Sequence, residues 1–169
     1  TYQGTTLRPT GTPIVDLAPQ PAISAAQQRA THQFVQSLNR RHLLQRGPST
    51  ELDARIEAYE LAYRMQSAAP AAVDLADESA ETLALYGVGE KHTDEFGRRC
   101  LLARRLVERG VRFVQLYSGD TNGWDAHNDV AKNHTDYCRR TDKPVAGLLT
   151  DLRRRGLLDD TLVIWGGEF

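Results

Sequence analysis

Two short runs rich in β-branched and aromatic residues constrain this chain most strongly. They are Val111–Tyr117 and Thr161–Trp165, and each has the length and composition of a buried β-strand. After the first run and a polar loop, the sequence has helical periodicity as far as Arg155. A strand, a helix and a second strand form a β-α-β unit, whose strands run parallel because the connection is long. The sequence therefore predicts an α/β fold for this part of the chain.

Candidate site residues follow both predicted strands. Asp125 and His127 lie in the polar loop Ser118–Asn128, and Glu168 comes directly after the second strand. In open α/β sheets, ligands bind beyond the carboxyl ends of the strands. We therefore expect Asp125, His127 and Glu168 to converge at one edge of the sheet, as metal ligands or as acid/base groups.

The spacing of Asp125 and His127 is compatible with a shared metal ion. Residues two apart in an extended loop point to the same side, so that both can reach one ion. A carboxylate oxygen with an imidazole nitrogen suits zinc, manganese or iron better than calcium. We expect a divalent metal, and its identity among zinc, manganese and calcium stays open. The alternative is that Asp125 caps the next helix. Trp124 either lines a pocket or locks the loop by packing.

The remainder of the chain is predicted to be mainly helical. We expect helices from Ser24 to about Arg46, from Ser49 or Thr50 to about Gln66, over Glu78–Tyr86, and from Thr93 or Asp94 to a stop at Gly110. Ser67–Asp77 is predicted to be a loop. Pro144 is predicted either to kink the last helix or to divide it into two. Residues 1–92 are thus expected to form a mainly helical cap or insertion. Residues 93–169 are expected to form an α-β-α-β part of the core, truncated at its C-terminus.

Charge and composition exclude some classes of function. The formal net charge of −1 argues against a nucleic-acid-binding protein, and no run is apolar enough to span a membrane. Arginines cluster on the predicted helices near acidic residues, and we interpret these clusters as solvated helix faces. They are Arg98-Arg99, Arg104-Arg105, Arg139-Arg140 and Arg153-Arg154-Arg155. Cys100 and Cys138 fall in the apolar periodicity of their helices. Free, buried thiols are expected, with a disulfide between them as the alternative.

Longer motifs carry a resemblance to a known family. The W-D-x-H motif at Trp124–His127 is followed by G-L-L-D-D-T-L-V-I-W-G-G-E-F at Gly156–Phe169, and the segments QGTTLRP and ELDARIEAYELAYRMQ fit the same pattern. The chain resembles, over nearly its whole length, a large bacterial family of sulfatase-like proteins of unknown function in the alkaline phosphatase superfamily.

The resemblance implies a fragment of an alkaline-phosphatase-like sheet and metal-dependent hydrolysis of sulfate or phosphate esters. The substrate would be a small-molecule or saccharide ester, and the location exported or periplasmic. Glu168 stands where true sulfatases have a metal-binding Asp, and Phe169 where they have a His. The nucleophile would lie upstream, so the chain itself is expected to be inactive. The alternative is a non-catalytic pseudoenzyme or exported binding protein that keeps the fold. The oligomeric state stays open.

Overall fold

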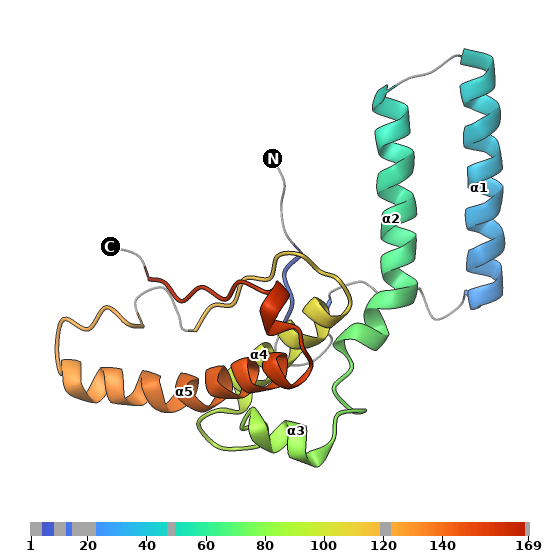
Figure 1. The fold of residues 1–169 in the computed structure, drawn as a ribbon. Helices are drawn as coiled ribbons and strands as arrows, with labels where there is room; N and C mark the ends of the chain where they lie inside the picture. Colours follow the sequence, from blue (N-terminus) through green and yellow to red (C-terminus); the bar gives the residue numbers. More distant parts are fainter. Residues whose placement is uncertain (1–4, 9–12, 15–22, 47–49, 119–122, 168–169) are drawn as a thin grey trace. The chain divides into compact units, whose positions relative to one another are not determined.

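The computed structural model describes residues 5–8, 13–14, 23–46, 50–118 and 123–167. Its elements are α1 (Ala25–Arg46), α2 (Thr50–Val73), α3 (Ala80–Leu85), α4 (Asp94–Glu108), α5 (Val130–Arg154) and the 3-10 helix η1 (Leu158–Asp160) (Figure 1). The chain divides into two compact units. One is built on α1 and on α2 as far as Ala71, and the other on the residues from Ala72 onward together with Thr6–Pro13. No helix in the described ranges is long and apolar enough to cross a membrane, as predicted.

The predicted α/β fold is wrong, because the residues that the structure describes contain no β-strand and form a mainly helical protein. Val111–Tyr117 and Thr161–Trp165 have no regular secondary structure. A strand is stable only when neighbouring strands pair with its backbone N–H and C=O groups, and β-branched composition does not supply those neighbours. Phe113, Leu162 and Ile164 are accordingly 81%, 84% and 80% exposed. The predicted fragment of an alkaline-phosphatase-like sheet is therefore absent from the described residues.

In the first unit, α1 and α2 meet through polar and aromatic side chains. Nε2 of Gln36 donates a hydrogen bond to Oε1 of Glu60 at 2.8 Å. The rings of His32 and Tyr63 stack with their centroids 4.0 Å apart. Phe34, which the sequence places on the apolar face of this helix, is 63% exposed. Val35 and Leu38 on the same face are 45% and 48% exposed, so this apolar face of α1 is largely open to solvent.

Several predicted helix ends agree with the structure. Ser24 precedes α1, and its Oγ accepts a hydrogen bond from the amide of Gln27 at 3.2 Å. Gly110 and Gly156 follow the ends of α4 and α5 with φ angles of 85° and 69°. Glycine adopts this left-handed conformation without the steric cost that other residues bear, and so it commonly ends helices.

Two other predicted boundaries differ. Helix α2 continues beyond Gln66 and through Pro70 to Val73, so that much of the predicted loop is helical. The alanines around Pro70 have the highest helix propensity, which offsets the lost hydrogen bond of the proline. Helix α5 is a single helix that contains Pro144, and the proposed division there is wrong.

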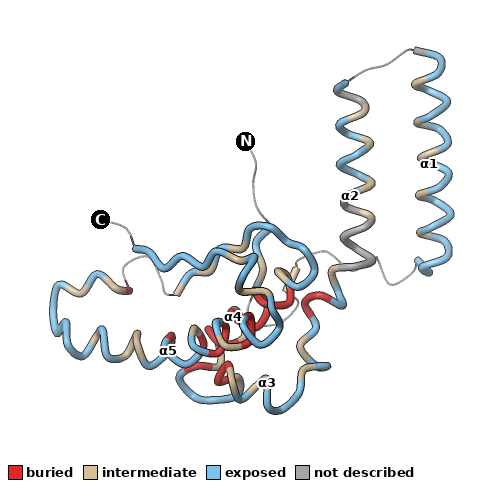
Figure 2. The backbone as a smooth tube through the Cα atoms, viewed as in Figure 1, coloured by how far each residue is buried: buried red, intermediate tan, exposed pale blue. Residues whose placement is uncertain are grey.

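The core of the second unit lies where α4 and α5 pack together. Its buried apolar members are Tyr86, Phe96, Cys100, Leu101, Leu148 and Leu152. Figure 2 shows the buried positions gathered on α4 and on the C-terminal half of α5. A Cβ at Gly97 would lie 2.3 Å from the carbonyl oxygen of Tyr86, and one at Gly147 would lie 2.6 Å from that of Leu85. Both helices therefore press directly against the chain after α3.

Candidate functional site

Asp125 and His127 lie next to each other in the segment that leads into α5. Oδ2 of Asp125 is 3.1 Å from Nε2 of His127. The two side chains are 67% and 83% exposed, respectively. Asp129, not Asp125, occupies the N-cap position of α5, and it makes no side-chain capping hydrogen bond. Asp125 is therefore directed to His127 and not to the helix end.

A metal centre requires more donors than this pair. A catalytic zinc ion typically has about three protein ligands. In the described parts of the chain, no three His, Cys, Asp or Glu side chains are grouped closely enough to hold an ion. Glu168, the third predicted ligand, lies outside the described residues. Asp125 and His127 thus offer two donors, and the assignment of all three residues as metal ligands stays a prediction.

Trp124 anchors this loop to the rest of the second unit. Its Nε1 donates to the backbone oxygen and to Oγ of Ser118, at 3.2 and 3.1 Å. Its ring lies 5.0 Å from that of Tyr137 and 6.4 Å from that of Trp165, centroid to centroid. Of the two predicted roles for Trp124, these contacts correspond to locking the loop by packing.

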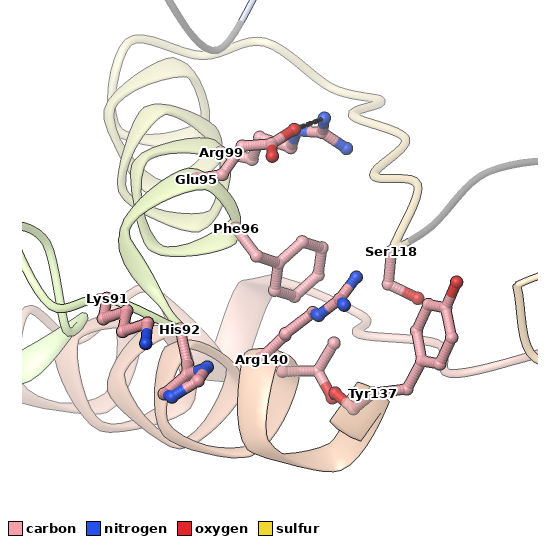
Figure 3. A pocket seen from close by; sticks show the side chains of 9 residues that line it. Lys91, His92, Glu95, Phe96, Arg99, Ser118, Tyr137 and Arg140 are labelled. Carbon is pink, nitrogen blue, oxygen red and sulfur yellow. Dashed lines mark hydrogen bonds and ion pairs between the residues drawn. The ribbon is translucent and has the colours of Figure 1, made fainter. Parts of the chain in front are cut away.

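A cleft adjoins the anchored loop. Its volume is about 550 Å³, within the range of about 300–1,000 Å³ that is usual for small-molecule sites. The lining residues come from the turn before α4, the first turns of α4, the irregular segment that follows it, and the middle of α5 (Figure 3). They are Lys91, His92, Glu95, Phe96, Arg99, Ser118, Tyr137, Arg140 and Thr141.

Positive charge predominates in this cleft. Arg99 forms an ion pair with Glu95, the only carboxylate among the lining residues (Figure 3). The guanidinium carbon of Arg140 lies 5.0 Å from the centroid of the Tyr137 ring, in a cation–π contact. Neither Lys91 nor Arg140 has an acidic partner among the described residues. The positive charges of these two side chains are therefore not neutralised by any described residue.

The N-terminus of α4 adds hydrogen-bond donors to the cleft. Thr93 is the N-cap of α4, but its side chain makes no capping hydrogen bond and donates instead to the carbonyl oxygen of Gly87 at 2.7 Å. Where the structure describes the chain, the amides of Glu95 and Phe96 have no backbone acceptor, and both residues line the cleft. Amides at a helix N-terminus, together with the helix dipole, attract anions.

The interpretation of the arginine clusters as solvated faces is wrong for Arg104 and Arg105, which are only 2% and 6% exposed. Arg98 and Arg139 do pair with acidic residues of their own helices, at 3.0 and 3.8 Å. Arg99 and Arg140 instead line the cleft. Neighbouring residues on a helix point about 100° apart, so a doublet can serve two faces. This helix geometry is the feature of the sequence from which Arg99 and Arg140 could have been predicted as binding residues.

A second charged cluster, the Arg104 network, is buried between α4, α5 and the segment before α3. Nη2 and Nη1 of Arg104 donate to Glu78 and Glu108 at 2.7 and 2.8 Å. Its Nε lies 3.0 Å from Oδ2 of Asp151, close enough for an ion pair although the orientation is not that of a hydrogen bond. The hydroxyl of Tyr86 donates to the same oxygen at 3.0 Å. The side chain of Arg104 is only 2% exposed.

The Arg104 network also shifts proton affinities. Burial alone would raise the pKa of Glu78, but hydrogen bonds from Arg105 and Arg104 outweigh it and hold this pKa below the usual value of 4.5. Burial and the charge of Asp151 raise the pKa of Tyr86 far above the ordinary range. Glu78 is therefore ionised and Tyr86 neutral at physiological pH.

The two cysteines are both free, as expected. Burial raises the pKa of the Cys100 thiol to about 12, so this thiol is protonated and unreactive at neutral pH. Cys138 is half-buried. The alternative of a disulfide between Cys100 and Cys138 is therefore excluded in this structure.

Comparison with known proteins corrects the resemblance stated above. No curated protein and no solved structure matches this chain. Residues 1–169 match the model of one family, described as a protein of unknown function (DUF1501). The resemblance to sulfatase-like proteins of the alkaline phosphatase superfamily is wrong, because this match carries no such assignment and the described residues contain no sheet. The chain belongs to the DUF1501 family of proteins of unknown function.

Proposed function

We propose that this protein binds a small molecule bearing a sulfate or phosphate ester in the cleft between α4 and α5. The observation that supports the proposal is a hollow lined by Lys91, Arg99 and Arg140 with Glu95 as its only carboxylate. Arginine side chains bind such oxyanions through charge-assisted, often bidentate, hydrogen bonds. A cation without an acidic partner in its own protein is available to an anionic ligand.

The lining of the cleft indicates the rest of the ligand. Phe96 and Tyr137 offer aromatic surface beside the cations, which suits the organic part of a small-molecule or saccharide ester. The chain as a whole has a formal net charge of −1, so the cationic cleft does not belong to a generally basic protein. Nucleic-acid ligands are recognised by extended basic surfaces, so a small ester is favoured over a nucleic acid.

Calorimetric titration with phenyl phosphate and phenyl sulfate tests the proposal. Replacing Arg140 by Gln, or Lys91 by Gln, is expected to weaken binding of both ligands at least about tenfold, since a hydrogen bond to a charged group is involved. Arg139→Gln is the matched control: it removes the same charge from the neighbouring position, which pairs with Asp136 outside the cleft. Absence of binding to the unaltered protein, or equal losses in R139Q and R140Q, would overturn the proposal.

Metal-dependent hydrolysis of the bound ester is the second candidate function. It is favoured by the position of Trp124, which joins the Asp125–His127 segment to two cleft residues, Ser118 and Tyr137. Asp125 and His127 would hold a divalent ion, zinc, manganese or calcium, with Glu168 as the third proposed ligand. An ion held there would polarise the ester and generate a nucleophile from water. Binding without catalysis requires only the cleft, and so it ranks first.

Metal titration distinguishes the two candidates. In the hydrolytic case, Asp125→Ala should lower bound zinc or manganese at least about tenfold, as for the loss of groups that support metal ligands. Binding of phenyl phosphate in the absence of metal should not change in this variant, because Asp125 does not line the cleft. Unchanged metal content in D125A would remove the hydrolytic candidate and leave the binding function standing.

A further inference from the structure

Glu95 is an unexpected residue for a site that receives an anion. It is the only carboxylate that lines the cleft, and its side chain is 65% exposed. Its Oε1 accepts a hydrogen bond from Nη2 of Arg99. Its second oxygen has no hydrogen-bond partner among the described residues. One acceptor oxygen is therefore presented beside the cations that would hold the ligand.

This oxygen affects sulfate and phosphate esters differently. A sulfate monoester carries no proton near neutral pH, so a carboxylate can only repel it. A phosphate monoester has a second pKa of about 6 and, at and below that pH, keeps a hydroxyl on phosphorus. That hydroxyl can donate a charge-assisted hydrogen bond to a carboxylate. The same side chain thus weakens the binding of one ester class and strengthens that of the other.

We propose that Glu95 makes the cleft selective for phosphate monoesters in their singly protonated form over sulfate monoesters. This inference rests on the proposed binding function and specifies its ligand. Lys91 and Arg140 would hold the unprotonated oxygens, and Glu95 would accept a hydrogen bond from the P–O–H group. A ligand without this proton meets a repelling carboxylate, and binding sites often gain specificity through such unfavourable contacts with the wrong ligand.

Other charged groups around the cleft act on both esters alike. Arg99 faces Glu95 from α4, Lys91 and His92 lie in the turn before α4, and Arg140 comes from α5. Positive charge on any of these groups tightens the binding of any anion. At the acidic end of the titration, where both ligands are largely monoanions, the ratio of the two affinities removes this common contribution. The ratio is therefore the quantity that reports on Glu95.

The test measures dissociation constants of phenyl phosphate and phenyl sulfate between pH 5.5 and pH 8.5. At the acidic end, where both ligands are largely monoanions, we expect phosphate to bind at least about tenfold tighter, as for a hydrogen bond to a charged group. As the pH rises and the phosphate loses its proton, the preference should fall relative to that of Glu95→Gln, because the cations act alike in the two proteins. In Glu95→Gln, the preference at the acidic end should shrink to within about threefold, because the amide is uncharged.

Glu90→Gln is the matched control, since it removes a nearby carboxylate that pairs with Lys143 and does not line the cleft. This variant should keep the phosphate preference and its pH dependence. Equal ratios in the unaltered protein and in E95Q would overturn the role of Glu95 while leaving the binding function intact. Failure of either ligand to bind the unaltered protein would overturn the binding function itself, and the selectivity with it.

Discussion

Helices α4 and α5 carry two clusters of charge that differ in how completely they are paired. In the Arg104 network, the arginine meets Glu78, Glu108 and Asp151 within 3.0 Å and is 2% exposed. In the cleft, Lys91 and Arg140 are exposed and have no acidic partner among the described residues. The first cluster is complete without a ligand, whereas the second has charge left for one.

The difference separates a structural role from a binding role. Buried ions are tolerated only when partners compensate their lost hydration, so the Arg104 network holds α4, α5 and the segment before α3 in one arrangement. Exposed cations keep their hydration and contribute little to stability. They can therefore be directed at a ligand at little cost to the fold. Substitutions in the two clusters should thus affect different observables.

The largest effect is expected from Arg104→Met. Removing the guanidinium leaves the buried carboxylates Glu78 and Asp151 without one of their charged partners, which should lower the free energy of unfolding by about 3–5 kcal/mol. Arg153→Met is the matched control on α5, because Arg153 is exposed and should change stability by no more than about 0.5 kcal/mol. Urea unfolding followed by circular dichroism measures both. Similar small losses in the two variants would show that the network is not structural.

A smaller effect is expected from acid, through Glu78. The pKa of Glu78 is lowered in the folded protein, so its contribution to stability is complete above the unfolded value of 4.5 and is lost as the pH falls through the folded value. The stability difference between the unaltered protein and Glu78→Gln should therefore shrink as the pH falls from 7 to 3. Glu81→Gln, at a position whose side chain is 84% exposed, serves as the control. A difference that stays constant with pH would contradict this assignment.

The smallest effect on stability is expected from Arg140→Gln. Its guanidinium contacts the Tyr137 ring but no acidic group among the described residues, so the free energy of unfolding should change by no more than about 0.5–1 kcal/mol. The same substitution should cause the loss of ester binding given above. Thermal unfolding without ligand measures the first quantity. A destabilisation as large as that of R104M would mean that the two clusters have the same role.

The sequence predicted helices better than it predicted packing. Ser24 and Gly110 mark helix ends through local chemistry, and the structure agrees with both. Val111–Tyr117 has the composition of a strand, but strand formation depends on neighbours that a local pattern does not specify. The predicted site residues Asp125 and His127 do meet, because their proximity follows from spacing alone.

The cleft was missed for the same physical reason. Its residues come from a turn, two helices and an irregular segment that are distant in sequence, and Gly97 and Gly147 allow the two helices to pack against the chain after α3. Such convergence depends on the tertiary contacts at Tyr86 and not on any periodicity. The spacing in the arginine doublets indicated that Arg99 and Arg140 lie on a different helix face from their neighbours. Which of the two faces lines the cleft follows only from the tertiary structure.

The most direct test of the account is a ¹⁵N NMR titration with phenyl phosphate at pH 6. If the cleft binds the ester, the largest amide shifts should occur at Glu95 and Phe96, where the first turn of α4 offers free donors. Amides around Arg104 should move little, because the charges of that network are already paired within the protein. Saturable shifts centred on Glu95 and Phe96 are the predicted result. Shifts that do not saturate, or that centre on any other part of the chain, would contradict the central claim.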